Sequence, residues 1–363
     1  MTDSASPRVP PGVRVAIVHR PSSFSDRWIA FCASHGISHS VVDGYSSDIV
    51  ARLRGHDALL WHFDHEDATD LLMARHVLAA AREAGLVTFP DFATAWHFDD
   101  KIAQKYLLEA LGAPLVPSWV FYDREKAVEW LRTAELPVVA KLRAGAGSAN
   151  VRLLRNLREA ERYCALMFGD GIRPVSGYFT DSMTRLRSVG SRAQLVDKLR
   201  RLPRALGRRL QLQRRAPRER GYVLFQRFVP GNMFDTRVTV VGQRAWAFIR
   251  HVRKNDFRAS GSRSIDFDPA RVNVECVRIA YAAARDLGSQ SMAFDFVTTP
   301  SGDPQLVEIS YGYNPDVVHE VPGQWRPDLT WEPGHRRAED EILDGVLQEC
   351  AARAGKLTGS PRC

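Results

Sequence analysis

The stretch LPVVAKLRAGAGSANV, residues 136–151, joins a run of strand formers to a lysine and a tract of small residues. A cation beside backbone N–H groups that no large side chain shields is suited to phosphate oxygens. The tract is not a P-loop, because no Gly-Lys-Ser/Thr closes it. It also lacks the third glycine of GxGxxG, and neither HRD nor DFG of a protein kinase follows. Lys141 and the loop after it are therefore a candidate phosphate site of another type.

A pair of carboxylates comes from a predicted hairpin, AFDFVTTPSGDPQLVEIS, whose turn centres on Ser301-Gly302. Pairing outward from this turn sets Asp295 opposite Glu308, with Ser310 on the same face. The other face is predicted to pack a core and reads Phe294, Phe296, Val307 and Ile309. Like charges directly opposite each other destabilise a sheet. A bound Mg²⁺ would make this pair of carboxylates stabilising, since Mg²⁺ takes oxygen ligands and bridges phosphates. The alternative is that one carboxylate forms a salt bridge with an arginine.

A second predicted hairpin, DTRVTVVGQRAWAFIR, has Gly242-Gln243 at its turn, with glycine first as a type II′ turn requires. Pairing from the turn sets Asp235 opposite Arg250 and places Arg237 on the same face. One acid with two bases suits a ribose hydroxyl and phosphate oxygens. The alternative is a surface ladder of ion pairs worth at most ~1 kcal/mol each.

The elements before these hairpins predict two α/β units. Short strands over 14–20, 39–45 and 57–63, with a helix over 67–85, indicate a small parallel sheet. Ligands collect at the carboxyl ends of such strands. The segment HFDHED (62–67) follows the third strand there, and a solvated loop that touches substrate is preferred to a metal site. The first strand is followed by HRPSSFSDRW instead of GxGxxG, so a dinucleotide site is not expected.

A second, mixed unit follows the first. It is predicted from a helix at 99–112, a strand at 117–123, a helix at 124–134, strands in LPVVAKLR and VRLLRN, a helix at 156–168 and a strand at 222–229. Helices at 270–288 and 337–353 separate the hairpins and close the chain. The fold class is therefore α/β with α+β character.

Composition is ordinary for a globular protein, with 45% hydrophobic and 25% charged residues. No apolar run approaches the ~20 residues of a membrane span, and the N-terminus lacks the apolar region of a signal peptide. We therefore expect a cytoplasmic protein. The five cysteines are scattered and never form CxxC, which argues against a disulfide framework or a zinc site.

The net charge of +8 comes from one segment. Residues 185–220 hold 13 Arg/Lys and two acids, whereas the rest has 37 basic and 40 acidic residues. Its apolar residues recur at roughly helical spacing, and few aromatic residues are present to stack bases. A solvated excursion, or a helix on an anionic membrane or partner, is therefore favoured over nucleic-acid binding.

The order of these motifs resembles the ATP-grasp superfamily from about residue 95 to 320. The α/β unit before it resembles the pre-ATP-grasp domain of that superfamily. WHFDDKIAQKYLLEALGAPLVPS, NMFDTRVTVVG, NDFRASGS and PGQW…LTWEPGH are similar to RimK-type ATP-grasp proteins, which we associate with bacterial surface-polysaccharide and secondary-metabolite pathways. The resemblance implies an N-terminal domain (1–95), a lid (96–170), a basic insertion (171–221), a C-terminal subdomain with the metal site (222–356) and a tail (357–363).

The resemblance also implies roles for single residues. Lys101 and Lys141 would grip nucleotide phosphates under the loop with Gly145, Gly147 and Ser148. The adenine hinge would be Gln226, Arg227, Phe228 and Val229, and Asp235 would contact the ribose. Arg237 and Arg250 would lie near the transferred phosphate, with Arg258 and Ser260 facing the acyl acceptor. Asp295, Glu308 and Ser310 would hold magnesium; Ser310 stands where many relatives have Asn, and Asn314 is an alternative third ligand.

The implied reaction uses ATP to convert a carboxylate into an acyl-phosphate, which an amine then attacks, releasing ADP and phosphate. ATP and two Mg²⁺ are the expected cofactors, with Mn²⁺ as an alternative ion. Small-molecule carboxylates and amines are the expected substrates; a lipid-linked or polymeric anionic substrate could dock on 185–220, at the inner membrane face. No specific nucleic acid is expected as a partner, and the protein is expected to form a homo-oligomer. The alternatives are phosphate transfer to a hydroxyl, a degenerate ATP-binding scaffold, and a non-enzymatic nucleic-acid- or membrane-binding protein.

Overall fold

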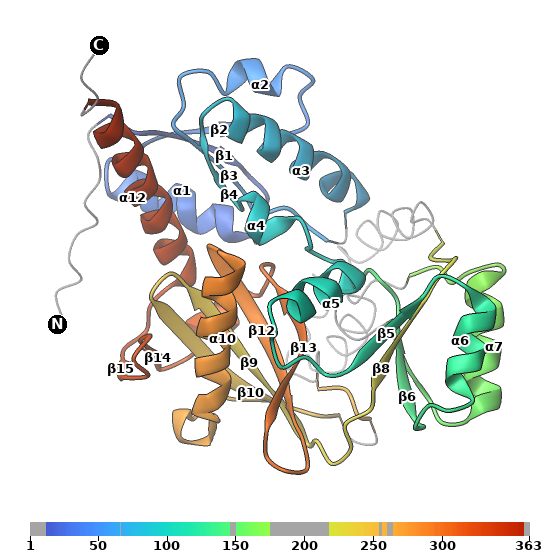
Figure 1. The fold of residues 1–363 in the computed structure, drawn as a ribbon. Coiled ribbons are helices and arrows are strands. Elements are labelled where there is room, and N and C mark those ends of the chain that lie inside the picture. The colour runs from blue at the N-terminus through green and yellow to red at the C-terminus, as the bar shows by residue number, and fades with distance from the viewer. Residues whose placement is uncertain are drawn as a thin grey trace, which may run out of the picture.

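The computed structural model describes residues 12–65, 67–145, 150–174, 218–253, 256–259 and 264–358. Within these residues the strands form three sheets (Figure 1). Helices cover them in the mixed α/β arrangement that the sequence predicts. The basic segment 185–220 lies outside the described residues except for its last three positions, so its predicted helix is not assessed.

The N-terminal sheet is parallel and has the order β2-β1-β3-β4, as predicted for an α/β unit. Its strands are β1 (Arg14–Val18), β2 (Ser38–Val42), β3 (Ala58–Trp61) and β4 (Val87–Phe89). The helices between them are α1 (Phe24–Ser34), α2 (Ile49–Arg52) and α3 (Ala68–Glu83). Asp67 caps α3 by accepting a hydrogen bond from the Thr69 backbone N–H at 2.9 Å, which explains why this helix starts where the sequence predicts.

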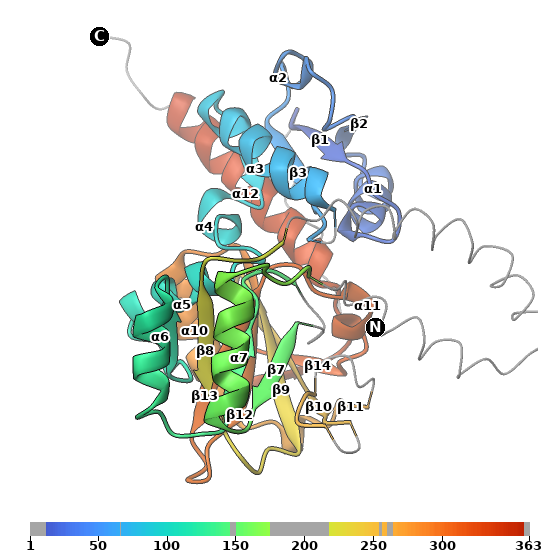
Figure 2. The same cartoon turned by 90° about the vertical axis from the view of Figure 1, so that its right-hand side faces the viewer.

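The lid sheet is antiparallel, with the order β5-β8-β6-β7. It is formed by β5 (Ser118–Phe121), β6 (Val138–Lys141), β7 (Val151–Leu154) and β8 (Val223–Arg227). Helices α6 (Arg124–Leu131) and α7 (Leu157–Phe168) cover one face and enclose a separate core (Figure 2). Because β8 pairs on both sides with lid strands, the lid resumes after the insertion, and the boundary predicted at residue 222 moves to the end of β8.

The large sheet has the order β13-β12-β9-β10-β14-β15, and β11 (Ile265–Asp266) also pairs with β10. Its other strands are β9 (Phe234–Val241), β10 (Arg244–His251), β12 (Ser291–Thr298), β13 (Pro304–Ser310), β14 (Gly323–Trp325) and β15 (Trp331–Pro333). The remaining helices are α4 (Phe92–Ala95), α5 (Lys101–Ala110), η1 (Pro269–Arg271), α10 (Val274–Leu287), α11 (Pro315–His319) and α12 (Ala338–Thr358).

The hairpin registers agree with the sequence prediction at the residues that matter. Asp235 pairs with Arg250 across β9 and β10, and Asp295 pairs with Glu308 across β12 and β13. A β-bulge just after Asp295 then shifts the register, so that Phe296 pairs with Leu306. The prediction that Val307 packs a core is therefore wrong, since the extra residue turns it to the opposite face.

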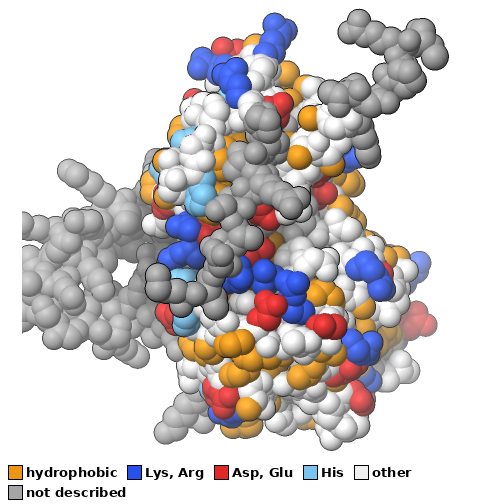
Figure 3. Space-filling view, turned by 90° about the vertical axis from the view of Figure 1, so that its left-hand side faces the viewer, with side chains coloured by type: hydrophobic (Ala, Val, Ile, Leu, Met, Phe, Trp, Pro, Cys, Tyr) orange, Lys and Arg blue, Asp and Glu red, His pale blue; other side chains and the backbone are white. Residues whose placement is uncertain are grey.

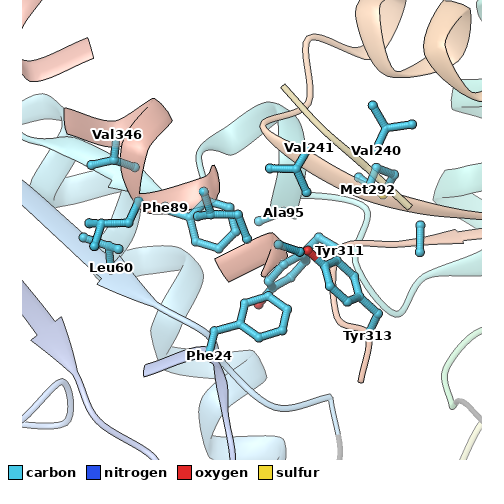
Figure 4. Packing of buried hydrophobic residues seen from close by; sticks show 14 of the residues in the cluster. Phe24, Leu60, Phe89, Ala95, Val240, Val241, Met292, Tyr311, Tyr313 and Val346 are labelled. Carbon is cyan, nitrogen blue, oxygen red and sulfur yellow. The ribbon is translucent and has the colours of Figure 1, made fainter. Parts of the chain in front are cut away.

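The N-terminal sheet and the large sheet share one hydrophobic core. Tyr311 and Tyr313, which follow β13, lie close to Phe24 of α1 in this core (Figure 4). Helix α12 runs alongside α1 (Figure 1), and the Trp28 indole N–H donates to the Glu339 carbonyl at 3.0 Å. These contacts place the carboxyl edge of the parallel sheet next to the end of β13.

The face that carries β14, β15 and the start of α12 has mixed charge (Figure 3). Arg244 lies 2.9 Å from both Glu332 and Glu341, and Arg336 lies 3.8 Å from Glu341. These ion pairs compensate the positive charge locally. Among the described residues no helix is long and apolar enough to cross a membrane. Cys32, Cys164, Cys276 and Cys350 are buried free thiols.

Candidate active site

A cavity of about 150 Å³ opens between the lid sheet and the large sheet. Side chains from α5, β6, β8, β12 and β13 line it, so segments more than 150 residues apart meet there. Its lining includes most of the residues singled out in the sequence: Lys101, Lys141, Gly145, Gln226, Arg227, Phe228, Val229, Asp235, Arg258, Asp295 and Glu308. Gly147, Ser148 and Ser260 lie outside the described residues.

Lys101 is the first residue of α5, where Asp100 caps the helix. Its ammonium donates to the Gly145 carbonyl at 2.6 Å and lies 3.2 Å from Glu308 Oε1. Burial alone would lower its pKa, but the charges of Glu308 and Asp99 outweigh burial and raise it. Lys101 therefore stays protonated in the cavity.

Lys141 is the last residue of β6 and is only 6% exposed. Its ammonium forms no ion pair with another residue of the described chain. Burial lowers its pKa to about 8, and the attraction of Glu308 only partly opposes that effect. The cavity thus contains a buried cation that no carboxylate of the described residues neutralises by direct contact, which is the environment that a phosphate group would complement.

Asp99 and Lys101 of the DDK segment both bond Gly145 and so fix the start of the glycine loop. Asp99, with a left-handed φ of 55°, accepts a hydrogen bond from the Gly145 N–H at 2.8 Å. Gly145 itself has a φ of 103°, and a Cβ there would lie 2.2 Å from Asn150 Nδ2. This position therefore requires glycine. Sequence reasoning did not single out Asp99, although it stands two residues before Lys101.

Asp295 is held by two arginines. Arg237 bonds both of its oxygens, at 2.7 and 2.8 Å, and Arg250 reaches Oδ2 at 2.9 Å. Arg250 also bonds both oxygens of Asp235, at 2.6 and 2.7 Å. Burial opposes ionisation of Asp295, but the two guanidinium groups hold its pKa well below the usual range. Arg250 is 7% exposed, so this cluster is not the surface ladder considered as an alternative.

The carboxylates fit a magnesium ion only in part. No group of three His, Cys, Asp or Glu residues with metal-binding geometry occurs among the described residues. Mg²⁺ nevertheless binds in many proteins through one or two carboxylates together with substrate phosphates. Asp295 and Glu308 line the cavity that holds both lysines and therefore suit an ion that arrives with a nucleotide. The Ser310 hydroxyl instead bonds the Gly312 backbone, donating to its carbonyl at 2.9 Å.

Part of the cavity lining is apolar and suits a flat aromatic ring. Val116, Val139 and Val297 line it together with Phe228, which contacts Phe257 edge-to-face at 5.8 Å. Val307 joins this wall because of the bulge in β12 and β13. The bulge thus contributes to the shape of the site, and neither the turn residues nor the alternation of side chains along the strands predicts this bulge.

The remaining candidates make contacts with other parts of the protein. Arg258 lines it while its guanidinium lies 2.7 Å from Asp256. His62 of the HFDHED segment is buried and stacks on Phe24 with ring centroids 3.7 Å apart. Burial lowers the pKa of His62 well below its ordinary value, so it is a neutral core residue. Asp64 lies 3.3 Å from Arg20.

Comparisons with known proteins give the fold. No family model matches the chain, and neither does any curated protein. Among solved structures, a RimK domain ATP-grasp protein from Sphaerobacter thermophilus matches with a TM-score of 0.54 and 16% identity, over 93% of this chain and 100% of that one. D-alanine–D-alanine ligase from Bacillus anthracis, complexed with ATP, gives 0.53 and 12%, over 95% and 100%.

A third match is the biotin carboxylase domain of 2-oxoglutarate carboxylase from Hydrogenobacter thermophilus, complexed with MgADP, ADP and bicarbonate. It has a TM-score of 0.57 and 14% identity, over 92% of this chain and 69% of that one. The chain therefore has the ATP-grasp fold, as its motif order predicts. At these identities the likeness concerns the fold, and the activity has to be argued from the site.

Proposed function

We propose that this protein is an ATP-dependent ligase that activates a carboxylate as an acyl-phosphate and joins it to an amine, with release of ADP. The observation that carries the proposal is the charge distribution of the cavity. Lys101 and Lys141 line it together with Asp295 and Glu308, and its apolar lining residues suit an aromatic ring. Triphosphate, metal and base thus each have a matching part of one cavity.

The proposed chemistry needs charge stabilisation more than a nucleophilic side chain. Phosphoryl transfer is catalysed mainly by positioning and by cations around the moving group. Lys141 would contact phosphate oxygens, because it is a buried cation that pairs with no carboxylate of the described residues. Arg237 and Arg250 lie beside Asp295, where they would neutralise charge on the transferred phosphoryl group. Mg²⁺, held by Asp295 and Glu308, would supply further neutralisation when it is bound with the nucleotide.

The likeness to ligases supports the reaction class. D-alanine–D-alanine ligase and the RimK domain protein share the fold over nearly their whole length. An N5-carboxyaminoimidazole synthetase from Staphylococcus aureus, complexed with ADP, matches with a TM-score of 0.54. We therefore propose small carboxylates and amines as substrates, ATP and Mg²⁺ as cofactors, and a homo-oligomer at work in the cytoplasm. For the 185–220 segment we propose docking of a lipid-linked or polymeric anionic substrate.

An isotope experiment tests the reaction class. The full chain is incubated with MgATP, pooled amines and pooled carboxylates labelled with ¹⁸O, and phosphate is analysed by mass spectrometry. An acyl-phosphate route moves one ¹⁸O from the carboxylate into inorganic phosphate and produces ADP. Formation of AMP and pyrophosphate would refute the proposal. Transfer of phosphate to a hydroxyl, with no inorganic phosphate released, would also refute it.

A matched pair of variants tests the assigned carboxylates. Asp295→Asn with Glu308→Gln is expected to lower ATP turnover by at least ~10³-fold, since both groups face the reacting phosphates. Asp303→Asn is the control, because Asp303 lies in the exposed turn of the same hairpin. Wild-type turnover in the double variant would show that these carboxylates do not serve the reaction.

A further inference from the structure

The backbone of Arg143 joins the two elements that carry the cavity lysines. Arg143 follows Lys141 by two positions, at the start of the glycine loop. Its carbonyl accepts a hydrogen bond from the Lys101 backbone N–H at 3.0 Å, and its own N–H donates to the Tyr222 hydroxyl at 2.7 Å. The positions of the two lysines relative to each other therefore depend on how firmly Arg143 is held.

A closed ring of hydrogen bonds holds Arg143. The Tyr222 hydroxyl, which accepts from the Arg143 N–H, uses its single proton to donate to Glu219 Oε2 at 2.9 Å. The Arg143 guanidinium completes the ring, because it lies 3.4 Å from Glu219 Oε1, and it also donates to Asp100 at 3.1 Å. Glu219 is 8% exposed, so water competes little for these bonds.

Glu219 and Tyr222 are themselves fixed to the lid. The backbone of Glu219 exchanges two hydrogen bonds with Ile172, at 2.8 and 2.9 Å. Gly171, beside this pair, has a φ of 70°, and a Cβ there would lie 2.6 Å from the Glu219 carbonyl oxygen. Tyr222 is buried in the core of the lid. The described residues that line the cavity include neither of the two, nor Arg143, so all three act on the cavity only indirectly.

We propose that Arg143, Glu219 and Tyr222 are positioning residues for nucleotide phosphates. This inference rests on the proposed function, which places a nucleotide in the cavity. The two lysine ammonium groups repel each other, so the chain that carries them has to hold both at the phosphates. The ring does so through the Arg143 backbone. A loop that is already ordered also loses less conformational entropy when a phosphate binds, which favours binding.

The test separates phosphate binding from binding of the nucleoside. The affinities of the full chain for MgADP and for adenosine, which lacks phosphate, are measured by calorimetry. Tyr222→Phe leaves the Arg143 N–H and one Glu219 oxygen without their partner. It should weaken binding of MgADP about tenfold, roughly the factor that one hydrogen bond contributes. The affinity for adenosine should stay unchanged, because the ring acts only on the phosphate end of the ligand.

Two further variants separate positioning from stability. Arg143→Gln removes the guanidinium from between Asp100 and Glu219 and should weaken MgADP by a similar factor, again without an effect on adenosine. The Arg143 side chain is 45% exposed, so this change leaves the lid core intact. Tyr163→Phe is the matched control. Tyr163 is a buried tyrosine of the same core whose hydroxyl bonds none of the described residues, and its loss should leave both affinities unchanged.

The outcomes distinguish this inference from the proposed function. If wild type binds neither ligand, the proposed function fails, and the inference fails with it. If wild type binds MgADP and Tyr222→Phe weakens both ligands by the same factor, the ring serves the lid as a whole and its positioning role is refuted. Wild-type affinity for MgADP in Tyr222→Phe and Arg143→Gln would also refute it, while the nucleotide site would stand.

Discussion

The two lysines of the cavity should have opposite effects on stability, although both are assigned to phosphate. Lys141 is buried and forms no ion pair with a carboxylate of the part of the chain that the structure describes, and burial lowers its pKa to about 8 from 10.5. A difference of 2.5 in pKa corresponds to about 3 kcal/mol. This is the cost of keeping the ammonium charged in the folded chain near pH 7. Lys141→Met removes the charge, so the free energy of unfolding should rise by about 2–3 kcal/mol.

Lys101 should behave in the opposite way. Its ammonium bonds the Gly145 carbonyl and pairs with Glu308, and its pKa is raised despite burial. Lys101→Met leaves a carbonyl and a carboxylate without their cation, which should lower the free energy of unfolding by about 1–3 kcal/mol. Lys126→Met on the exposed face of α6 is the control and should leave it unchanged.

The assay is urea unfolding at pH 7, with and without MgADP. A ligand at a hundred times its dissociation constant should stabilise wild type by about 2.7 kcal/mol, and Lys141→Met should lose this gain. The pH dependence gives a second check. Between pH 8 and 10.5 the unfolded chain keeps the Lys141 proton that the folded chain has lost, so wild-type stability rises with pH there. Lys141→Met should lack that rise. A Lys141→Met protein that is less stable than wild type at pH 7 would refute the reasoning.

Two further predictions concern buried charge. Arg250→Met removes both hydrogen bonds to Asp235 and one contact with Asp295, which should lower the free energy of unfolding by about 3–5 kcal/mol. The control is Arg278→Met, at an exposed arginine, which should leave the urea midpoint unchanged. Equal effects of the two variants would contradict the assignment of a stabilising buried role to Arg250. Burial lowers the pKa of His97 to about 4. As the pH falls, His97 therefore binds a proton in the unfolded chain at a higher pH than in the folded chain, and about 3 kcal/mol of stability should be lost between pH 6.5 and 4. His97→Gln should flatten that part of the profile, and an unchanged slope would show that His97 is not its source.

The hairpins were the most predictable part of the site, because a turn and a period of two fix both strands. Gly242-Gln243 alone placed Asp235 against Arg250, and the turn at Ser301-Gly302 placed Asp295 against Glu308. These contacts lie within about 15 residues of sequence. Local chemistry therefore determines them before any long-range pairing is considered.

The contacts between hairpins could not be predicted in the same way. The register of β9 against β12 sets Asp295 beside Arg237, and about 50 residues separate these strands. No turn fixes this pairing, so sequence reasoning left open whether Asp295 meets a metal or an arginine. The effect of the bulge after Asp295 also depends on distant residues. The bulge turns Val307 to the other face of the strand, and this face lines a cavity only because the lid packs against it. Asp99 was not predicted as a site residue, because its role depends on a hydrogen bond from the Gly145 backbone N–H.

Together these contacts indicate where added negative charge would be accommodated. Asp295 already has two guanidinium groups, and Glu308 has the ammonium of Lys101. Each of these cations is therefore largely compensated by a carboxylate that it touches. Lys141 is charged at neutral pH without such a contact in the described residues, and it lies on the same wall as Gln226. A phosphate group at Lys141 would supply the compensating charge that the other cations already have, so added negative charge is expected to be accommodated there.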